Sequence, residues 1–193
     1  MARFADMGHE VVALYLTRGE RGLQGKTQAE AAAIRTGEAQ RACTILKARA
    51  LFLNQADADT VVSVPRYEEF RHSWQQKSHM SFLRTGRSMP TGITAPRRCW
   101  FTTPGSSAAG SLPCYYEVST GEETQHFHPT DYVNIAATES RKRAACFLHA
   151  SQQPAKFYAY HEKMHGFRGF EAGCQRAEAF VHHEQSPAVQ LPG

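Results

Sequence analysis

A strand, a glycine-rich loop and a capped helix follow one another in the first fifty residues, and this order constrains the fold most. Residues 10–16 (EVVALYL) are a compact apolar run rich in β-branched side chains, which predicts a buried strand. Three glycines in the next ten residues mark a loop. Thr27 and Glu30 have capping-box spacing, and the Ala-rich sequence after them predicts a helix to about residue 47. The apolar face expected on this helix consists of Ile34, Ala42, Ile45 and Leu46.

Strands and helices continue to alternate in the rest of the chain, on both sides of a central interruption. Residues 50–53 are typical of a second strand, and Pro65 is typical of the first turn of a helix. In the C-terminal part, the elements expected are a strand and turn over 114–121, a strand over 132–135, helices over 136–151 and 155–165, and a buried element over 177–183. Alternation of this kind predicts an α/β domain with a parallel sheet.

The interruption, residues 71–114, differs from the rest of the chain in composition. It holds no Asp or Glu, contains six of the 22 basic residues, and has neither helical nor strand periodicity. The remaining residues carry 16 basic and 18 acidic groups, so their net charge is −2 although the whole chain has +4. The basic excess therefore belongs to this one segment. A structureless insert of such length is unusual inside a compact domain.

Composition excludes several classes of protein. Apolar residues make up 41% of the chain, which is enough for a core and too many for a disordered protein. No apolar run approaches the ~20 residues of a membrane span, and the apolar run over 11–16 is too short for a signal peptide. Five cysteines without paired spacing favour reduced thiols. We therefore expect a cytoplasmic protein without a membrane span.

Histidine clusters are the first candidates for chemistry. His161, Glu162 and His165 match H-E-x-x-H, in which two imidazoles on one helix face bind zinc and the glutamate acts as general base. The sequence after His165 lacks a third ligand at the expected distance, which favours a polar helix end. A second cluster, in a loop that enters a strand, consists of His126, His128 and Asp131. The pair His182–His183 is expected at the surface.

The loop after the first strand is a candidate binding site by its position. Ligands of α/β proteins bind beyond the carboxyl ends of strands, where Arg18 and Glu20 are expected to lie. Arg35 and Glu38, three residues apart on the first helix, have the spacing of an exposed ion pair.

These segments resemble a known family. The N-terminal ARFADMGHEVVALYLTRGE, the glycine loop and I-R-x-x-E-A are similar to the PIG-L/LmbE-like de-N-acetylases. The C-terminal YYEVSTGEETQHFHPTDYVNI and KRAACFLHASQQPAKFYAYHEKMHGFRGFEAGCQRAEAF resemble one bacterial branch of that family. The resemblance covers about 1–70 and 115–187, so we expect a single domain over 1–187 and a tail over 188–193. It also explains H-E-K-M-H as part of the branch's C-terminal sequence.

The resemblance implies a Rossmann-like fold and zinc-dependent removal of an N-acetyl group from a GlcNAc-type sugar conjugate. In the family, metal-bound water attacks the amide carbonyl and an aspartate acts as general base. The zinc ligands come from A-H-P-D-D-E after the first strand and from an H-x-D-H-type motif in mid-chain. Neither motif is present here. The first precedes G-G-T-L-A-R-F in relatives, so we expect the first strand and its ligands to be missing.

The second motif should fall within residues 71–114. Codons that encode Ser88 to Trp100, read one base out of register, allow the series D-A-H-R-D-H-R-A-A-S-L-L, which contains the missing motif. We therefore predict a double frameshift, with breaks near residues 71 and 114, and a local failure of the fold between them. Three protein ligands are the norm for catalytic zinc. Without them, we expect no zinc at a family-type site and no catalysis.

The expectation that follows is a fragment-like, frame-disrupted de-N-acetylase relative with no assigned catalytic or metal residue. Arg18, Glu20 and Arg35 are the substrate contacts that the resemblance implies. Arg35 is the foremost of them, because its guanidinium can bind a carbonyl or a pair of hydroxyls with two donors at once. The expected partner is a small sugar conjugate, without nucleic acid, in a chain that can form a homo-oligomer. Two alternatives remain open: a zinc peptidase using His161, Glu162 and His165, and a non-catalytic protein that binds nucleic acid through the basic segment over 71–114.

Overall fold

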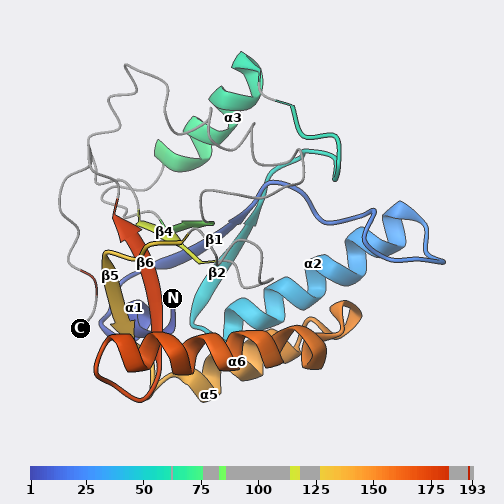
Figure 1. The fold of residues 1–193 in the computed structure, drawn as a ribbon. Coiled ribbons are helices and arrows are strands. Elements are labelled where there is room, and N and C mark those ends of the chain that lie inside the picture. The colour runs from blue at the N-terminus through green and yellow to red at the C-terminus, as the bar shows by residue number, and fades with distance from the viewer. Residues whose placement is uncertain (62, 76–82, 86–113, 118–126, 183–190, 192–193) are drawn as a thin grey trace. The chain divides into compact units, whose positions relative to one another are not determined.

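The computed structural model describes the chain except for residues 62, 76–82, 86–113, 118–126, 183–190 and 192–193. Its contacts divide the chain into two compact units. Figure 1 labels the helices and strands along the chain. Unit 1 consists of Met1–Thr60 and Ile135–Lys163, and unit 2 of Val61–Asn134 and Met164–Gly193. Among the described residues, no helix combines the length and the apolarity that crossing a membrane requires. Expectations for most of 71–114, including the shifted frame, lie outside the described residues.

Unit 1 is built on a parallel strand pair with helices. After the short helix α1 (Ala2–Asp6), strand β1 (Val11–Tyr15) leads through a loop to helix α2 (Gln28–Ile45), which returns the chain to β2 (Ala48–Phe52). β1 and β2 are parallel and in register from Val11 opposite Ala48 to Tyr15 opposite Phe52. This β-α-β order confirms the predicted alternation. Every residue of β1 is half-buried, however, where a fully buried strand was expected.

Helix α2 begins as the sequence predicts, but its buried face only partly matches the expected one. Thr27 Oγ1 accepts a hydrogen bond from the Glu30 N–H at 3.3 Å, and Glu30 Oε2 accepts one from the Thr27 N–H at 2.9 Å. The expected apolar face is confirmed only in part: Ala42 is buried, Ile45 and Leu46 are half-buried, and Ile34 is exposed. The buried face is made mainly of small side chains at Ala31, Ala39, Ala42 and Cys43, together with Glu38. Small side chains let the helix backbone approach its neighbours closely. The position of the large apolar residues therefore did not indicate which face of α2 is buried.

The C-terminal part of the chain supplies two further helices, of which α5 belongs to unit 1 and α6 runs from unit 1 into unit 2. α5 (Glu139–Phe147) and a 3-10 turn, η2 (Ala150–Gln152), occupy the stretch expected as one helix over 136–151. α6 (Pro154–Glu171) begins at Pro154 and continues six residues beyond the predicted end at residue 165. Proline is suited to the first turn of a helix, because the N–H it lacks has no helical partner there.

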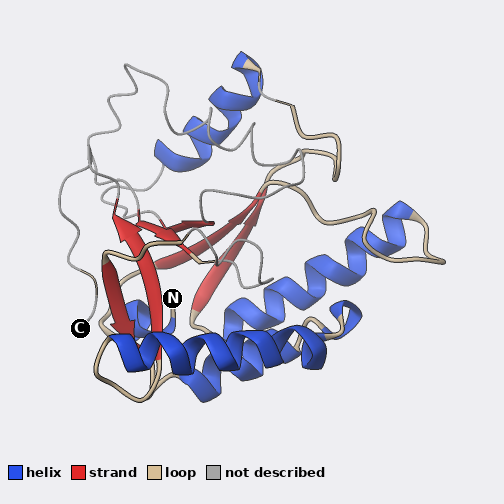
Figure 2. Cartoon of the chain, viewed as in Figure 1, coloured by secondary structure: helices blue, strands red, loops and turns tan. Residues whose placement is uncertain are grey.

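Unit 2 contains a four-stranded mixed sheet in the order β3-β4-β6-β5. Figure 2 draws the strands of the chain in red. Its strands are β3 (Leu83–Thr85), β4 (Cys114–Tyr116), β5 (Asp131–Asn134) and β6 (Ala177–His182), and helix α3 spans Val64–Gln75. β3 and β4 are parallel, whereas β6 is antiparallel to both of its neighbours. The α/β class is therefore confirmed, with the qualification that this sheet is not wholly parallel. β3 is a strand within the segment that shows no periodicity.

Candidate functional site

Arg35 fastens the loop after β1. Its Nη1 donates a hydrogen bond to the carbonyl oxygen of Gly19 at 2.8 Å. Gly19 has φ +67°, and a Cβ built there would lie 2.1 Å from the same Nη1. A Cβ on Gly22 would lie 2.4 Å from it. The guanidinium occupies the space that side chains at these two glycines would need. One N–H donor of Arg35 is bound to the loop backbone.

Glu20 joins this loop to the loop after β2. Its Oε1 accepts a hydrogen bond from the Asp57 N–H at 3.0 Å, and Asp57 Oδ2 accepts one from the Arg21 N–H at 3.3 Å. Glu20 Oε2 also accepts from the Arg18 N–H at 3.2 Å. Burial on its own would raise the pKa of Glu20, but these backbone donors outweigh it and lower the pKa. The ionised carboxylate of Glu20 thus links the loops that follow β1 and β2 by hydrogen bonds to their backbone N–H groups.

The Arg18 side chain lies over an aromatic ring at the same strand ends. Its guanidinium carbon is 5.0 Å from the centroid of the Phe52 ring, which stacks on Tyr15 at 5.0 Å. Arg18 Nη1 donates to Thr36 Oγ1 at 3.3 Å. The face of the Arg18 guanidinium therefore packs on the Phe52 ring, and only one of its five N–H donors is bound to Thr36. The other two expected substrate contacts, Arg35 and Glu20, bind the backbone of the loop instead.

Glu38 is buried and bound, so the expectation of an exposed Arg35–Glu38 ion pair is wrong. The residue is 3% exposed. Its Oε1 accepts from the Ser151 N–H at 2.8 Å and its Oε2 from the Ser151 hydroxyl at 2.6 Å. Burial lowers the pKa of nearby His149, the negative charge of Glu38 opposes that shift, and Arg35 adds to it. Arg35, Glu38 and His149 therefore share one electrostatic environment, which links α2 to the turn at η2.

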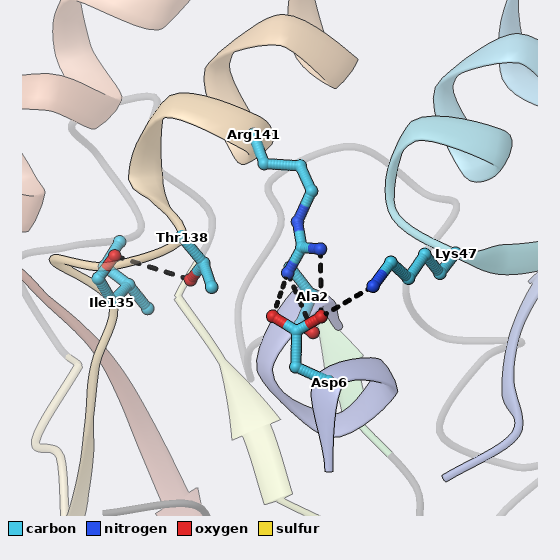
Figure 3. Close-up of polar contacts among 6 residues, drawn as sticks. All are labelled: Ala2, Asp6, Lys47, Ile135, Thr138 and Arg141. Carbon is cyan, nitrogen blue, oxygen red and sulfur yellow. Dashed lines mark hydrogen bonds and ion pairs between the residues drawn. The ribbon is translucent and has the colours of Figure 1, made fainter. Parts of the chain in front are cut away.

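A separate ionic cluster anchors α1 (Figure 3). The Arg141 guanidinium binds the Asp6 carboxylate, with Nη1 2.9 Å from Oδ1, and Nη2 donates to the Ala2 carbonyl at 3.2 Å. Lys47 Nζ donates to Asp6 Oδ1 at 3.2 Å. Arg141 is half-buried by these contacts. The cluster fixes α1 to α5 and to the turn after α2.

The histidine candidates do not form a ligand set in the described part of the chain. His161, Glu162 and His165 lie on α6 as predicted, with His165 3% exposed and Glu162 exposed. His128 is exposed, Asp131 accepts from the Thr130 hydroxyl at 2.6 Å, and His126 lies outside the described residues. His182 is half-buried, with Nδ1 3.9 Å from Cys114 Sγ, and His183 is not described.

Zinc is the metal that the family resemblance implies, and its fit can be tested on the donors present. Among the described residues, no group of three or more His, Cys, Asp or Glu side chains is arranged to hold a metal ion. Catalytic zinc is normally held by three protein ligands. The described residues therefore do not fit a family-type zinc centre. The peptidase hypothesis stays a prediction.

Sequence reasoning missed a buried ion pair in unit 2. Arg168 and Glu117 are each 4% exposed at their side chains. Arg168 Nε and Nη2 donate to the two carboxylate oxygens of Glu117 at 2.9 and 2.7 Å, and its Nη1 donates to Glu171 at 2.6 Å. The hydrogen bonds to Glu117 and Glu171 raise the pKa of Arg168 despite burial. Arg168 and Glu117 are 51 residues apart, so no local spacing reveals their pairing.

Comparison with solved structures identifies the fold. A hydratase of Pseudomonas putida KT2440, GalB, described as 4-carboxy-2-hydroxymuconate hydratase, is 18% identical and matches with a TM-score of 0.80 over 98% of this chain and 90% of that chain. The N,N′-diacetylchitobiose deacetylase of Pyrococcus horikoshii is 20% identical, with a TM-score of 0.73 over 94% and 76%. A conserved protein of Thermus thermophilus is 20% identical, with a TM-score of 0.76 over 99% and 88%.

Comparison of sequences finds a family model that matches the N-terminal part of the chain. No curated protein matches the chain significantly. Residues 1–81 match the sequence model of PIG-L, described as GlcNAc-PI de-N-acetylase. The matched part contains β1, the loop after it and α2, and so includes Arg18, Glu20 and Arg35. Residues 1–81 of the chain are therefore similar in sequence to the PIG-L/LmbE-like de-N-acetylases.

Proposed function

We propose that this chain binds an N-acetylglucosamine-type sugar conjugate at the loops after β1 and β2 without hydrolysing it. The observation that carries the proposal is the fastened loop: Arg35 and Glu20 are used to build it, and both belong to the part that matches a GlcNAc-PI de-N-acetylase. The fold alone does not choose a reaction, because a hydratase and a deacetylase both share it. The family match favours the sugar amide.

Arg18 is the proposed direct contact. Its guanidinium carbon lies 5.0 Å from the Phe52 ring centroid, and its Nη1 already donates to Thr36. A guanidinium stacked in this way keeps donors in its plane for a carbonyl or a pair of hydroxyls. Arg35 and Glu20 are positioning residues in this proposal, because their polar atoms bind the loop backbone.

Absence of hydrolysis is the second part of the proposal. The part of the chain that the structure describes provides no three-ligand set for zinc. A zinc ion would supply an activated water and polarise the amide carbonyl. Without its ligands, the residues at the loop can orient the sugar but have no nucleophile to offer.

Binding and hydrolysis can be separated with N,N′-diacetylchitobiose as the probe. We expect saturable binding by calorimetry or ligand-observed NMR, and no acetate release by proton NMR with zinc added. Arg18→Ala should weaken binding about tenfold or more, because a charge-assisted hydrogen bond contributes about 1.5–3 kcal/mol. Arg49→Ala is the matched control, since Arg49 makes an exposed ion pair with Glu10 at 3.2 Å.

The two parts fail separately. Acetate release by the chain as given overturns the absence of hydrolysis. Lack of saturable binding, or equal losses in Arg18→Ala and Arg49→Ala, overturns the proposed binding site. Acetate release that disappears in His165→Ala would instead favour a zinc site on α6.

A further inference from the structure

Helix α6 exposes four large aromatic side chains. Phe157 is 46% exposed, Tyr160 48%, Phe167 53% and Phe170 84%. At 100° per residue, these positions fall within one side of the helix. Single exposed apolar residues are ordinary, whereas a row of aromatics along one helix marks an interaction surface. We call these four residues the aromatic row.

Other positions of the same helix supply its core contacts. Tyr158 is 4% exposed, His165 3% and Arg168 4%. Tyr158 packs edge-on against Phe147 with ring centroids 5.8 Å apart, and Arg168 binds Glu117. The helix is therefore already anchored by a face that does not include the aromatic row.

The order of residues along the aromatic row is self-complementary. About a midpoint between Lys163 and Met164, Phe157 is the mirror position of Phe170, and Tyr160 that of Phe167. Beyond the aromatics, Lys156 is the mirror position of Glu171. An antiparallel pair of identical helices brings each residue opposite its mirror position. In such a pair, Phe157 of each copy would face Phe170 of the other, and Tyr160 would face Phe167. Lys156 would face Glu171 at each end of the paired helices.

Charge on the two end residues fits this arrangement. Lys156 is exposed, and the Glu171 side chain is 30% exposed while its Oε2 accepts from Arg168 and Tyr132. The second carboxylate oxygen of Glu171 is a further acceptor. In a two-fold symmetric interface, residue i contacts j of the partner and j contacts i, so both ends gain an ion pair from one sequence pattern.

We propose that α6 pairs antiparallel with α6 of a second copy of this chain through the aromatic row. Antiparallel helices pack with interaxial distances of about 8–10 Å, so aromatics spaced three and seven residues apart can interdigitate across the seam. The occupant is the chain itself, because both the aromatic order and the end charges are mirror-symmetric. The proposal is independent of sugar binding.

Sedimentation velocity of the full chain over a wide concentration range tests the pairing. We expect a reversible dimer. Phe157→Lys and Phe170→Glu should each raise the dissociation constant about tenfold or more, because each places an unpaired charge in the seam. The double variant Phe157→Lys/Phe170→Glu should recover most of the lost affinity, since residue 157 of one copy faces residue 170 of the other. Ala155→Lys, at an exposed position outside the aromatic row, is the control.

Each outcome decides the proposal. Recovery in the double variant establishes the antiparallel register, because residues 157 and 170 are about 20 Å apart along one helix and cannot pair within a chain. A monomer at every concentration overturns the proposal. A dimer that is insensitive to both single variants, or one that the double variant weakens further, also overturns it, since either result requires another surface or register. Circular dichroism of each variant confirms that α6 is folded.

Discussion

Both carboxylate oxygens of Glu38 accept hydrogen bonds from Ser151, a residue 113 positions later in the chain. One bond comes from the Ser151 backbone N–H and the other from its hydroxyl. Because Glu38 is almost completely buried, its charge is stabilised chiefly by these donors. A single side chain on α2 therefore fixes the turn at η2, which follows α5.

Ser151→Ala should destabilise the chain by about 1.5–3 kcal/mol, because it leaves a buried carboxylate oxygen without its hydroxyl donor. Glu38→Gln should cost a comparable amount, since an amide offers one acceptor where the carboxylate offers two. Urea unfolding followed by circular dichroism measures both. Gln40→Ala, at an exposed position on the same helix, should stay within about 0.5 kcal/mol. Equal stability of all four proteins would contradict the role assigned to Glu38.

Gly19→Ala should destabilise more than Gly25→Ala. Both glycines have positive φ, +67° and +73°, but a Cβ at Gly25 meets nothing within 4 Å while a Cβ at Gly19 meets Arg35. The Arg35 guanidinium can move away, at the loss of its hydrogen bond to Gly19, so the extra cost should be about 1 kcal/mol.

A double-mutant cycle isolates this contribution. Arg35→Ala should cost less in the Gly19→Ala background than in the wild type, because the hydrogen bond is already lost there. Thermal and urea unfolding of the four proteins provide the measurement. Additive costs would mean that Arg35 does not occupy the space left by Gly19.

Arg168→Met should lower stability by about 3–5 kcal/mol, because Glu117 would remain buried without its partner. Arg168→Met/Glu117→Leu should be milder than the single variant, since no buried charge is left. Hydrogen exchange of the β4 and β6 amides reports the effect within unit 2. Arg66→Met, which breaks a more exposed pair with Glu69, should change stability by less than about 1 kcal/mol. A double variant less stable than the single one would refute this account.

Asp6 should stay ionised to unusually low pH. The hydrogen bond from Arg141 is the largest influence, aided by Lys47, and lowers the pKa of Asp6 from 3.8 to about 2. A folded-state pKa below the unfolded value means that the contribution to stability is present above pH 3.8 and is lost as pH falls toward about 2. Carboxyl NMR titration measures it directly.

Variants of Arg141 and Lys47 show which of these two residues lowers the pKa of Asp6 more. Arg141→Ala should return the pKa of Asp6 most of the way to 3.8, and Lys47→Ala should move it less, because the Arg141 hydrogen bond is the larger effect. Titration of wild-type Asp6 at its ordinary value would show that the cluster in Figure 3 does not persist in solution.

Local signals in the sequence predicted the elements of the fold well. The capping box that begins α2 lies within four consecutive residues, from Thr27 to Glu30, so the spacing of these two residues in the sequence predicts the start of the helix. The β-branched run before it gives β1. The direction of β6 was not predictable in this way, because pairing with both β4 and β5 depends on residues dozens of positions away.

The sequence indicated candidate site residues but not their contacts. The loop after the first strand indicated Arg18 and Glu20, and the family resemblance added Arg35; their role in binding stays a prediction. The hydrogen bond of Arg35 to the Gly19 carbonyl depends on a backbone turn that the sequence shows only as glycines. Glu38 has the spacing of a surface pair with Arg35, and only its long-range partner Ser151 explains why it is buried. Contacts across long sequence separations decided these cases.

The space that Arg35 takes from Gly19 and Gly22 also limits the order in which this loop can change over generations. A residue larger than glycine at position 19 or 22 meets the guanidinium at once, whereas a shorter residue at position 35 removes this contact first and leaves only the positive φ at position 19 against a larger residue. Substitutions at positions 19, 22 and 35 therefore depend on one another. A series of changes that begins at position 35 costs less stability than one that begins at position 19 or 22. Lineages that keep the arginine should be held to glycine at both loop positions.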